Sequence, residues 1–157
     1  MSRGRRVFAA LAALLTVSML APLPDADAAQ LGREDVVLIS ETGRHVIDAE
    51  IADTPGTRAG GLMFRRNLDP GKGMLFIYDR PQNITMWMKN TYISLDMIFA
   101  DQSGKIVRIA RNTEPFSTDI IEAGAPAKVV LEVPAGTARQ LKLKRGDRLE
   151  HTSVGAE

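Results

Sequence analysis

The residues best suited to chemistry lie in one short polar stretch, residues 87–96, within otherwise apolar sequence. On an extended strand Trp87 and Lys89 share one face, because side chains alternate along a strand. Asn90 and Thr91 favour a turn, where their side chains can bond nearby backbone groups. Asp96 interrupts an apolar run, and a buried carboxylate is costly unless donors reach it. The expected donors are Lys89, Asn90 and Thr91.

Two interpretations of this stretch remain open. Five of its side chains form either a self-satisfied turn network that holds strand register, or a small polar pocket with an aromatic wall, as in a small-ligand site: Trp87, Lys89, Asn90, Thr91 and Asp96. Asp96 and Lys89 could also act as an acid–base pair. However, the chain has no cysteine and none of the recognisable motifs of serine hydrolases, zinc proteases or nucleotide-binding enzymes. We therefore favour binding over catalysis, with Asp96 and Lys89 as the weak catalytic candidates.

Two further charged residues are candidates for either structure or function. Arg65 follows a predicted helix, where a cation interacts favourably with the helix dipole, or alternatively binds an anion. Glu132 lies in an apolar strand and shares a face with Val130, so one of the two is exposed or Glu132 pairs with a buried cation. For Glu132 we expect a paired structural carboxylate.

The sequence Met86-Trp87-Met88 raises the possibility of a copper site. Two thioethers on one strand face beside a tryptophan suit Cu(I). Methionine is also an ordinary core residue, and the two histidines, His45 and His151, are far apart in the sequence. We therefore expect no metal and no cofactor.

Apolar patterning predicts a domain made mainly of strands. Residues 36–52 are typical of a β-hairpin, and Thr54 with Pro55 marks the start of a helix that runs toward Met63 or Phe64. A second short helix follows Gly136, and residues 112–127 form the longest loop. Further strands are predicted over residues 73–78, 84–89, 95–100, 105–111, 128–133 and 148–152. The predicted class is α+β, mostly β: a curled antiparallel sheet, barrel-like or sandwich, with two short helices at its edges.

The first 28 residues are typical of a signal peptide, with a basic start, the apolar run 7–21 and the small-x-small cleavage pattern that ends at Ala28. The predicted organisation is therefore a signal peptide over 1–28, a flexible lead-in over 29–34 and one domain over 35–153. The expected location is periplasmic or secreted, after Sec or twin-arginine export. An uncleaved N-terminal anchor is the alternative interpretation.

The composition of the chain limits the kinds of partner that the domain can bind. The chain carries 20 Lys and Arg against 19 Asp and Glu, and the arginines of the leader account for its basic excess. A near-neutral domain lacks the basic excess that nucleic-acid binding requires. We expect a small ligand or a cell-envelope protein as partner, no nucleic acid, and membrane contact only through the signal peptide before cleavage.

Five motifs in order resemble the family called domain of unknown function 192, over nearly all of the chain after the leader. They are Gly61-Leu62-Met63-Phe64-Arg65, Gly73-Met74-Leu75-Phe76, Trp87-Met88-Lys89-Asn90-Thr91, Leu95-Asp96-Met97-Ile98-Phe99 and Val130-Leu131-Glu132-Val133-Pro134-Ala135-Gly136. The resemblance implies a compact β-rich fold, bacterial and archaeal distribution and frequent export, but no established activity. Met86 departs from the aromatic residue usual in the family, which weakens any role for it.

Together these observations predict an exported domain that binds a small polar or anionic ligand, or a cell-envelope partner. The expected binding residues are Arg65, Trp87, Lys89, Asn90, Thr91 and Asp96. The alternatives are a small envelope hydrolase or transferase that uses Asp96 and Lys89, and a non-catalytic protein-interaction module.

Overall fold

The computed structural model describes residues 31–155, which form nine strands and two short helices. The predicted signal peptide lies outside these described residues. The strands are β1 (Arg33–Ser40), β2 (Gly43–Ala52), β3 (Lys72–Gln82), β4 (Thr85–Met86), β5 (Leu95–Ala100), β6 (Ile106–Ala110), β7 (Ile121–Glu122), β8 (Ala127–Pro134) and β9 (Arg148–Glu150), and the helices are α1 (Pro55–Gly60) and α2 (Thr137–Gln140). Neither helix is long and apolar enough to cross a membrane.

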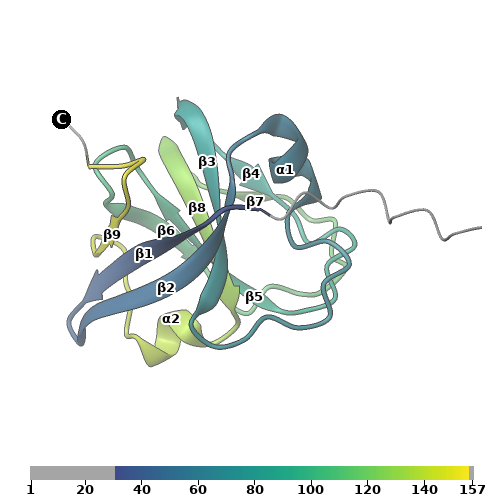
Figure 1. Cartoon of the computed structure of the whole chain (residues 1–157), viewed down its shortest axis with the longest axis horizontal. Helices are drawn as coiled ribbons and strands as arrows, with labels where there is room; N and C mark the ends of the chain where they lie inside the picture. Colours follow the sequence, from purple (N-terminus) through teal and green to yellow (C-terminus); the bar gives the residue numbers. More distant parts are fainter. Residues whose placement is uncertain (1–30, 156–157) are drawn as a thin grey trace, which may run out of the picture. The chain divides into compact units, whose positions relative to one another are not determined.

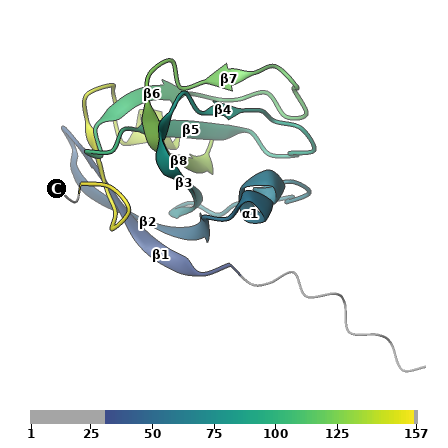
Figure 2. The same cartoon turned by 90° about the horizontal axis from the view of Figure 1, so that it is seen from above.

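Seven strands form one sheet in the order β6-β5-β8-β3-β2-β1-β9. The sheet curls until its ends nearly meet (Figures 1 and 2), and a bridge between Lys105 and Arg148 links the two edges. Gly104 allows this approach, because a Cβ atom there would lie 2.2 Å from the carbonyl oxygen of Leu149. The predicted mostly-β, barrel-like class is therefore confirmed.

Most neighbouring strands are antiparallel, including the predicted hairpin of β1 and β2. The exception is the parallel pair of β2 and β3, which α1 and its following loop connect. A chain that leaves β2 and returns to pair beside it in the same direction needs such a crossover. β1 begins at Arg33, inside the segment predicted to be a flexible lead-in.

Two apolar clusters lie on opposite faces of the three central strands, β3, β5 and β8. Inside the curl, Leu75, Ile98 and Leu131 pack with residues of β1, β2 and β9. On the outer face, Phe76, Met97 and Val130 pack against the segments that cover this face of the sheet. Strands buried on both faces are nearly continuous apolar runs, which explains their composition.

The outer cluster is covered by α1, its following loop and a second small sheet. β4 and β7 form this two-stranded sheet (Figure 2), so the segment 112–127 is not entirely a loop as predicted. The predicted strand 84–89 contains only the two residues of β4, since its continuation turns away toward β5. The pairing of β7 with β4 could not be predicted from the sequence, because each strand has only two residues, one polar and one apolar.

α1 begins as predicted, with Thr54 as N-cap, but is shorter than predicted. The side chains of Thr54 and Thr57 each bond the other residue's backbone N–H in a capping box. The helix ends before Gly61, whose φ of 46° is the left-handed conformation that favours glycine. A Cβ atom at Gly61 would also lie 3.1 Å from the ring of Phe76.

Three loops gather at one end of the domain, beside α1 (Figure 1). The amide of Phe64 donates to the carbonyl oxygen of Asn90 at 2.8 Å, which joins the loop after α1 to the loop after β4. The amides of Met88 and Phe116 bond Ser117 and Thr91 in the same way, which adds the loop after β6. These bonds bring the predicted stretch 87–91 into contact with two other segments.

Candidate functional site

A pocket of about 150 Å³ lies on the outer face of the sheet, between α1, β4 and the central strands β3 and β8. Its buried lining residues are Leu62, Phe76, Thr91 and Glu132. The exposed lining residues, which form its rim, include Trp87 and Lys89. We call this cavity the Glu132 pocket.

Glu132 is a buried carboxyl group without a partner. It is 4% exposed, and no described residue forms a hydrogen bond or an ion pair with its side chain. Among the described residues, every side-chain oxygen that is fully sealed from solvent has a hydrogen-bond partner. Because the Glu132 oxygens have no such partner, they are not fully sealed and must reach the open space of the pocket. The prediction that Glu132 is a paired carboxylate is therefore wrong.

Burial sets the protonation of this group. In the strand register Glu132 lies beside Met74 of β3 and Met97 of β5, both fully buried. Removal from water disfavours the charged form, and the pKa of Glu132 is raised from 4.5 to about 8. At neutral pH the pocket therefore contains a protonated carboxyl group, which can both donate and accept a hydrogen bond.

Two aromatic side chains of the pocket each have a cationic side chain above the ring. Lys89 Nζ lies 5.1 Å from the ring centroid of Trp87, and Arg58 Cζ lies 4.9 Å from that of Tyr78. Arg58 is held in place by a 2.8 Å hydrogen bond to the carbonyl oxygen of Ile77. Such cation–π contacts hold the charges close to the pocket without neutralising them.

Tyr78 connects the aromatic wall to the thioether of Met86. Its hydroxyl lies 3.8 Å from Met86 Sδ, and both residues line the pocket. Burial raises the pKa of the Tyr78 phenol, the nearby Arg58 charge opposes this rise, and the charge that Glu132 gains above about pH 8 adds to it. The phenol is therefore a neutral hydrogen-bonding group beside the Glu132 carboxyl.

Three of the predicted binding residues line the Glu132 pocket: Trp87, Lys89 and Thr91. Asn90 lies next to it but does not line it. Its φ of 55° is left-handed, and its amide lies 3.9 Å from Met63 Sδ. Its carbonyl oxygen accepts the Phe64 hydrogen bond described above, so Asn90 positions the turn.

Asp96 lies apart from this pocket. Its Oδ1 accepts a hydrogen bond from the amide of Asn112 and its Oδ2 one from the amide of Ala138, both at 2.8 Å. It lines a different hollow of about 340 Å³ with Arg111 and Arg139. The expectation that Lys89, Asn90 and Thr91 supply its donors, and that Lys89 and Asp96 share one pocket, is not met. Because residues 95–100 alternate, Asp96 faces the opposite side of the sheet from Glu132.

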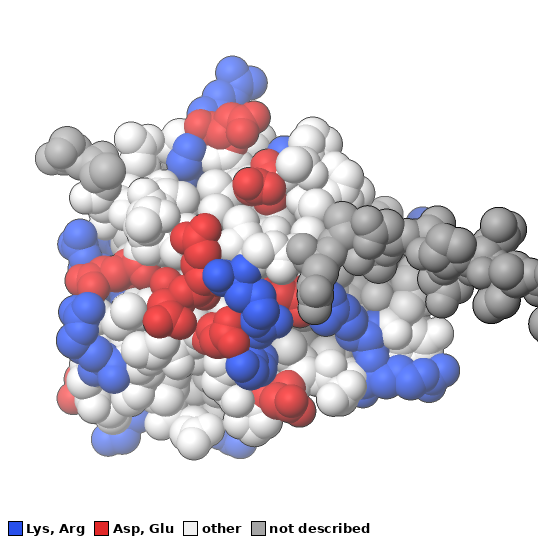
Figure 3. Space-filling view, in the orientation of Figure 1, with Lys and Arg blue, Asp and Glu red and all other residues white. Residues whose placement is uncertain are grey.

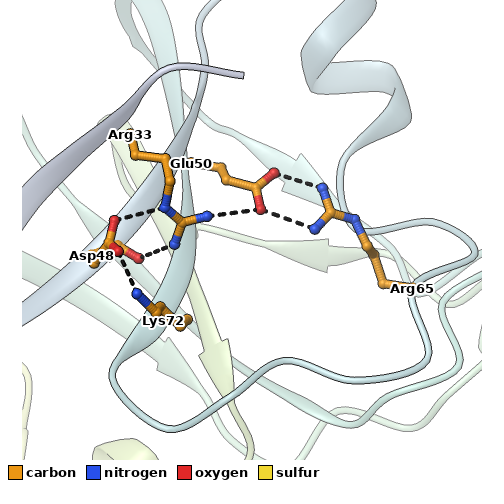
Figure 4. Close-up of polar contacts among 5 residues, drawn as sticks. All are labelled: Arg33, Asp48, Glu50, Arg65 and Lys72. Atoms are coloured by element: carbon orange, nitrogen blue, oxygen red, sulfur yellow. Dashed lines mark hydrogen bonds and ion pairs between the residues drawn. The ribbon is translucent and has the colours of Figure 1, made fainter. Parts of the chain in front are cut away.

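Arg65 belongs to an ion-pair network rather than to the pocket (Figure 4). Its guanidinium donates to both oxygens of Glu50, at 2.9 and 2.6 Å. Arg33 links Glu50 to Asp48, which also pairs with Lys72. The Arg65 hydrogen bonds lower the pKa of Glu50, since they favour its charged form. Figure 3 shows this face, where acidic and basic atoms lie side by side.

The two methionines of the copper interpretation differ in their surroundings. Met86 lines the pocket, whereas Met88 is buried in the outer cluster and its sulfur accepts a hydrogen bond from Thr113 Oγ1 at 3.2 Å. Residues 31–155 contain no group of three or more His, Cys, Asp or Glu residues that could hold a metal ion.

Sequence reasoning missed Arg58, Tyr78 and the pocket role of Glu132. A carboxylate in an apolar strand is a visible anomaly, but whether a cation covers it depends on elements distant in the sequence. Arg58 and Tyr78 carried no signal, because their contact arises from the crossover between β2 and β3.

The fold and site define a small, curled β-sheet domain with a pocket on its outer face, and the carboxyl group of Glu132 belongs to the lining of that pocket. The chain belongs to the DUF192 family, described as "Uncharacterized ACR", whose model matches residues 37–151. This agrees with the resemblance found in the sequence.

The solved structures that are similar to this chain include two bacterial proteins. A protein of unknown function from Novosphingobium aromaticivorans DSM 12444 is 37% identical with a TM-score of 0.77, and the match covers 79% of this chain and 89% of that one. A candidate transcription regulator from Sinorhizobium meliloti 1021 is 40% identical with a TM-score of 0.78, and the match covers 82% and 100%. No curated protein matches the chain.

Proposed function

We propose that this domain binds a small polar molecule in the Glu132 pocket. The observation that carries the proposal is the buried Glu132 carboxyl, which no described residue contacts through a hydrogen bond and which reaches the open cavity. A ligand that enters the pocket can bond to this carboxyl group, and it must do so if it displaces water, because a buried polar group left without a partner costs about 1–3 kcal/mol. Sites that are poorly satisfied in the free protein are typical of binding and catalytic positions.

The lining of the pocket supports this proposal. Small-ligand sites combine apolar and aromatic walls with a few convergent polar groups. Here Phe76, Tyr78 and Trp87 supply aromatic surface, and Glu132 and Thr91 supply polar groups. An apolar cavity of about 150 Å³ is known to admit a benzene molecule, so a ligand body of that size fits.

We further propose that binding takes place outside the cytoplasm. This part of the proposal rests on the signal-peptide pattern of residues 1–28 and the absence of cysteine from the chain. Secretion of the intact chain from a bacterial host, followed by N-terminal sequencing, tests it. A mature protein that begins at Ala29 supports export and cleavage, and a full-length protein confined to the cytoplasm contradicts it.

Two glycines near the pocket allow a matched test of binding. A methyl group at Gly61 would press on the Phe76 ring that lines the pocket, whereas Gly56 of α1 does not line the pocket and nothing lies within 4 Å of a Cβ atom there. A library of small polar molecules is screened by ligand-observed NMR against the wild type, Gly61→Ala and Gly56→Ala. We expect hits that are weakened in Gly61→Ala and retained in Gly56→Ala. Hits that bind all three equally, or no hits at all, would contradict pocket binding.

A second candidate function is the docking of a cell-envelope protein on the loops beside the pocket. Phe64 and Phe116 both adopt left-handed φ values, 64° and 63°, and their side chains are 65% and 55% exposed. Bulky residues in this conformation are strained by about 1–2 kcal/mol, and such strain clusters at functional sites. Envelope-protein capture that is abolished by Phe64→Ser with Phe116→Ser, but unaffected by Lys89→Met, would favour docking over ligand binding.

A further inference from the structure

We propose that the ligand of the Glu132 pocket is a small carboxylate with a flat apolar body, its anionic end held at the rim by Lys89 and Arg58 and its body beside Glu132. This inference rests on the proposed binding function and adds the chemical class of the ligand. Three features support it: the unpaired cations, the uncharged interior and the shape of the walls.

The first feature is the state of the two cations that line the pocket. Neither Lys89 nor Arg58 forms an ion pair with any carboxylate among residues 31–155. In contrast, Arg33, Arg65 and Lys72 are all paired in the network of Asp48 and Glu50, which lies on the same face of the sheet as Glu132, on the far side of β3. The pocket therefore has a positive rim that no acidic residue of the described chain neutralises.

The second feature is the absence of negative charge inside the pocket at neutral pH. Among the described residues that line it, Glu132 is the only acidic one. Because burial keeps its carboxyl group protonated near pH 7, an entering anion meets an O–H donor instead of a repelling charge. A cationic ligand would meet two positive charges at the rim, which disfavours it.

The third feature is the shape and chemistry of the interior. Phe76, Tyr78 and Trp87 present ring surfaces, and Met63 and Met86 present thioethers. Flat apolar bodies stack on rings, and thioethers contact aromatic groups favourably. The cavity of about 150 Å³ accommodates one six-membered ring, which leaves the carboxylate of such a ligand at the rim.

Three probes of similar size separate the charge preference from pocket binding: benzoate, benzyl alcohol and benzylammonium. Their dissociation constants are measured at pH 7 by ligand-observed NMR, with the fluorescence of Trp87, the single tryptophan of the chain, as a second readout. We expect benzoate to bind at least about tenfold more tightly than the other two, as a charge-assisted contact requires.

Lys89→Met tests whether the anion is held at the rim. Lys89 is exposed, so its loss leaves the fold intact, and Lys105→Met is the matched control because Lys105 is an exposed lysine outside the pocket. We expect benzoate affinity to fall about tenfold in Lys89→Met, with benzyl alcohol unchanged and Lys105→Met like the wild type. Equal benzoate affinity in Lys89→Met and the wild type would overturn the inference.

The pH dependence gives an independent readout. As the pH rises through about 8, Glu132 loses its proton and a negative charge appears beside the bound anion. Benzoate affinity should therefore fall between pH 7 and 9, by about tenfold, while the charge of benzoate itself stays constant. In Glu132→Gln this fall should disappear. A fall of the same size in Glu132→Gln would overturn the role of Glu132.

The outcomes separate this inference from the proposed function. If benzyl alcohol or benzylammonium binds more tightly than benzoate, and Gly61→Ala weakens it, the domain binds small molecules but the carboxylate class is wrong. The same conclusion follows if benzoate fails to bind while other library members give hits sensitive to Gly61→Ala. If neither the probes nor the library bind, both the class and the binding function are overturned.

Discussion

Glu132 of β8 lies directly across the antiparallel ladder from Met74 of β3, so its carboxyl group has a buried thioether side chain as its neighbour. Residues paired in this way point to the same face of the sheet. On its other side β5 contributes Met97, which is also fully buried. The carboxyl group therefore lies between apolar neighbours, which raises its pKa and makes its burial costly.

The first prediction is that Glu132→Gln stabilises the protein at alkaline pH. In the unfolded chain a glutamate ionises near pH 4.5, whereas in the folded protein Glu132 stays protonated until about pH 8. Between these values the unfolded state binds fewer protons, so wild-type stability decreases as the pH rises. We expect Glu132→Gln to have a higher Tm than the wild type at pH 8 and an equal Tm near pH 4, measured by circular dichroism.

The control for this prediction is Glu114→Gln, which removes an exposed carboxylate. Its Tm should follow the wild type across the same pH range. A Glu132→Gln protein that loses stability with pH as steeply as the wild type would contradict the raised pKa.

The second prediction concerns the end of α1. Gly61→Ala forces a left-handed φ on a residue with a side chain and presses it against Phe76, so we expect a loss of about 1–2 kcal/mol. Gly60→Ala replaces a helical glycine in open space, so it should raise stability by up to about 1 kcal/mol. Urea unfolding of both variants measures the difference, and a Gly61→Ala protein as stable as Gly60→Ala would refute this account.

The third prediction is that Asp96 acts on stability and not on binding. In Asp96→Asn one of the two carboxylate oxygens becomes an NH₂ group, which cannot accept a hydrogen bond from Asn112 or Ala138. The buried amide left without an acceptor should cost about 1–3 kcal/mol of the free energy of unfolding. Benzoate affinity should be unchanged, because Asp96 does not line the Glu132 pocket.

Asp119→Asn, at an exposed position, is the matched control for Asp96→Asn and should be neutral in urea unfolding. Loss of ligand affinity in Asp96→Asn without loss of stability would show instead that Asp96 takes part in binding.

The fourth prediction is a loss of stability in acid that depends on Arg65. Its two hydrogen bonds lower the pKa of Glu50 in the folded state, so they stabilise the fold above about pH 4.5 and their contribution is lost as the pH falls below that value. Arg65→Met should therefore cost about 1–2 kcal/mol at pH 7 and much less at pH 3.

The neighbouring Arg66→Met serves as the control, since Arg66 contacts the ring of Tyr92 and forms no ion pair among the described residues. Its effect should be small and similar at both pH values. If Arg65→Met remained equally destabilising at pH 3, the stability of this region would not depend on the ionised Glu50.

Local sequence patterns determined much of the fold. The hairpin of β1 and β2, the strand β5 with its stated bounds and the Thr54 N-cap followed from alternation, turn residues and capping chemistry. These features depend on residues close together in the chain, so each could be predicted without knowledge of the rest. The mostly-β class followed from their sum.

The candidate site was determined only in part by the sequence. The stretch 87–91 was identified because polar and aromatic residues are unusual beside apolar strands, and three of its members line the pocket. Asp96 lies a few residues further along the polar stretch 87–96, but the two faces of a strand point in opposite directions. Neighbours in sequence can therefore lie on opposite sides of a sheet.

The tertiary structure alone decided which residues meet at the pocket. The parallel crossover brings Arg58 over Tyr78, and the pairing of β8 between β3 and β5 surrounds Glu132 with methionines instead of a cation. Both contacts join residues distant in the sequence. An alternating pattern shows which face a side chain occupies, but which strand lies opposite depends on how the whole sheet closes.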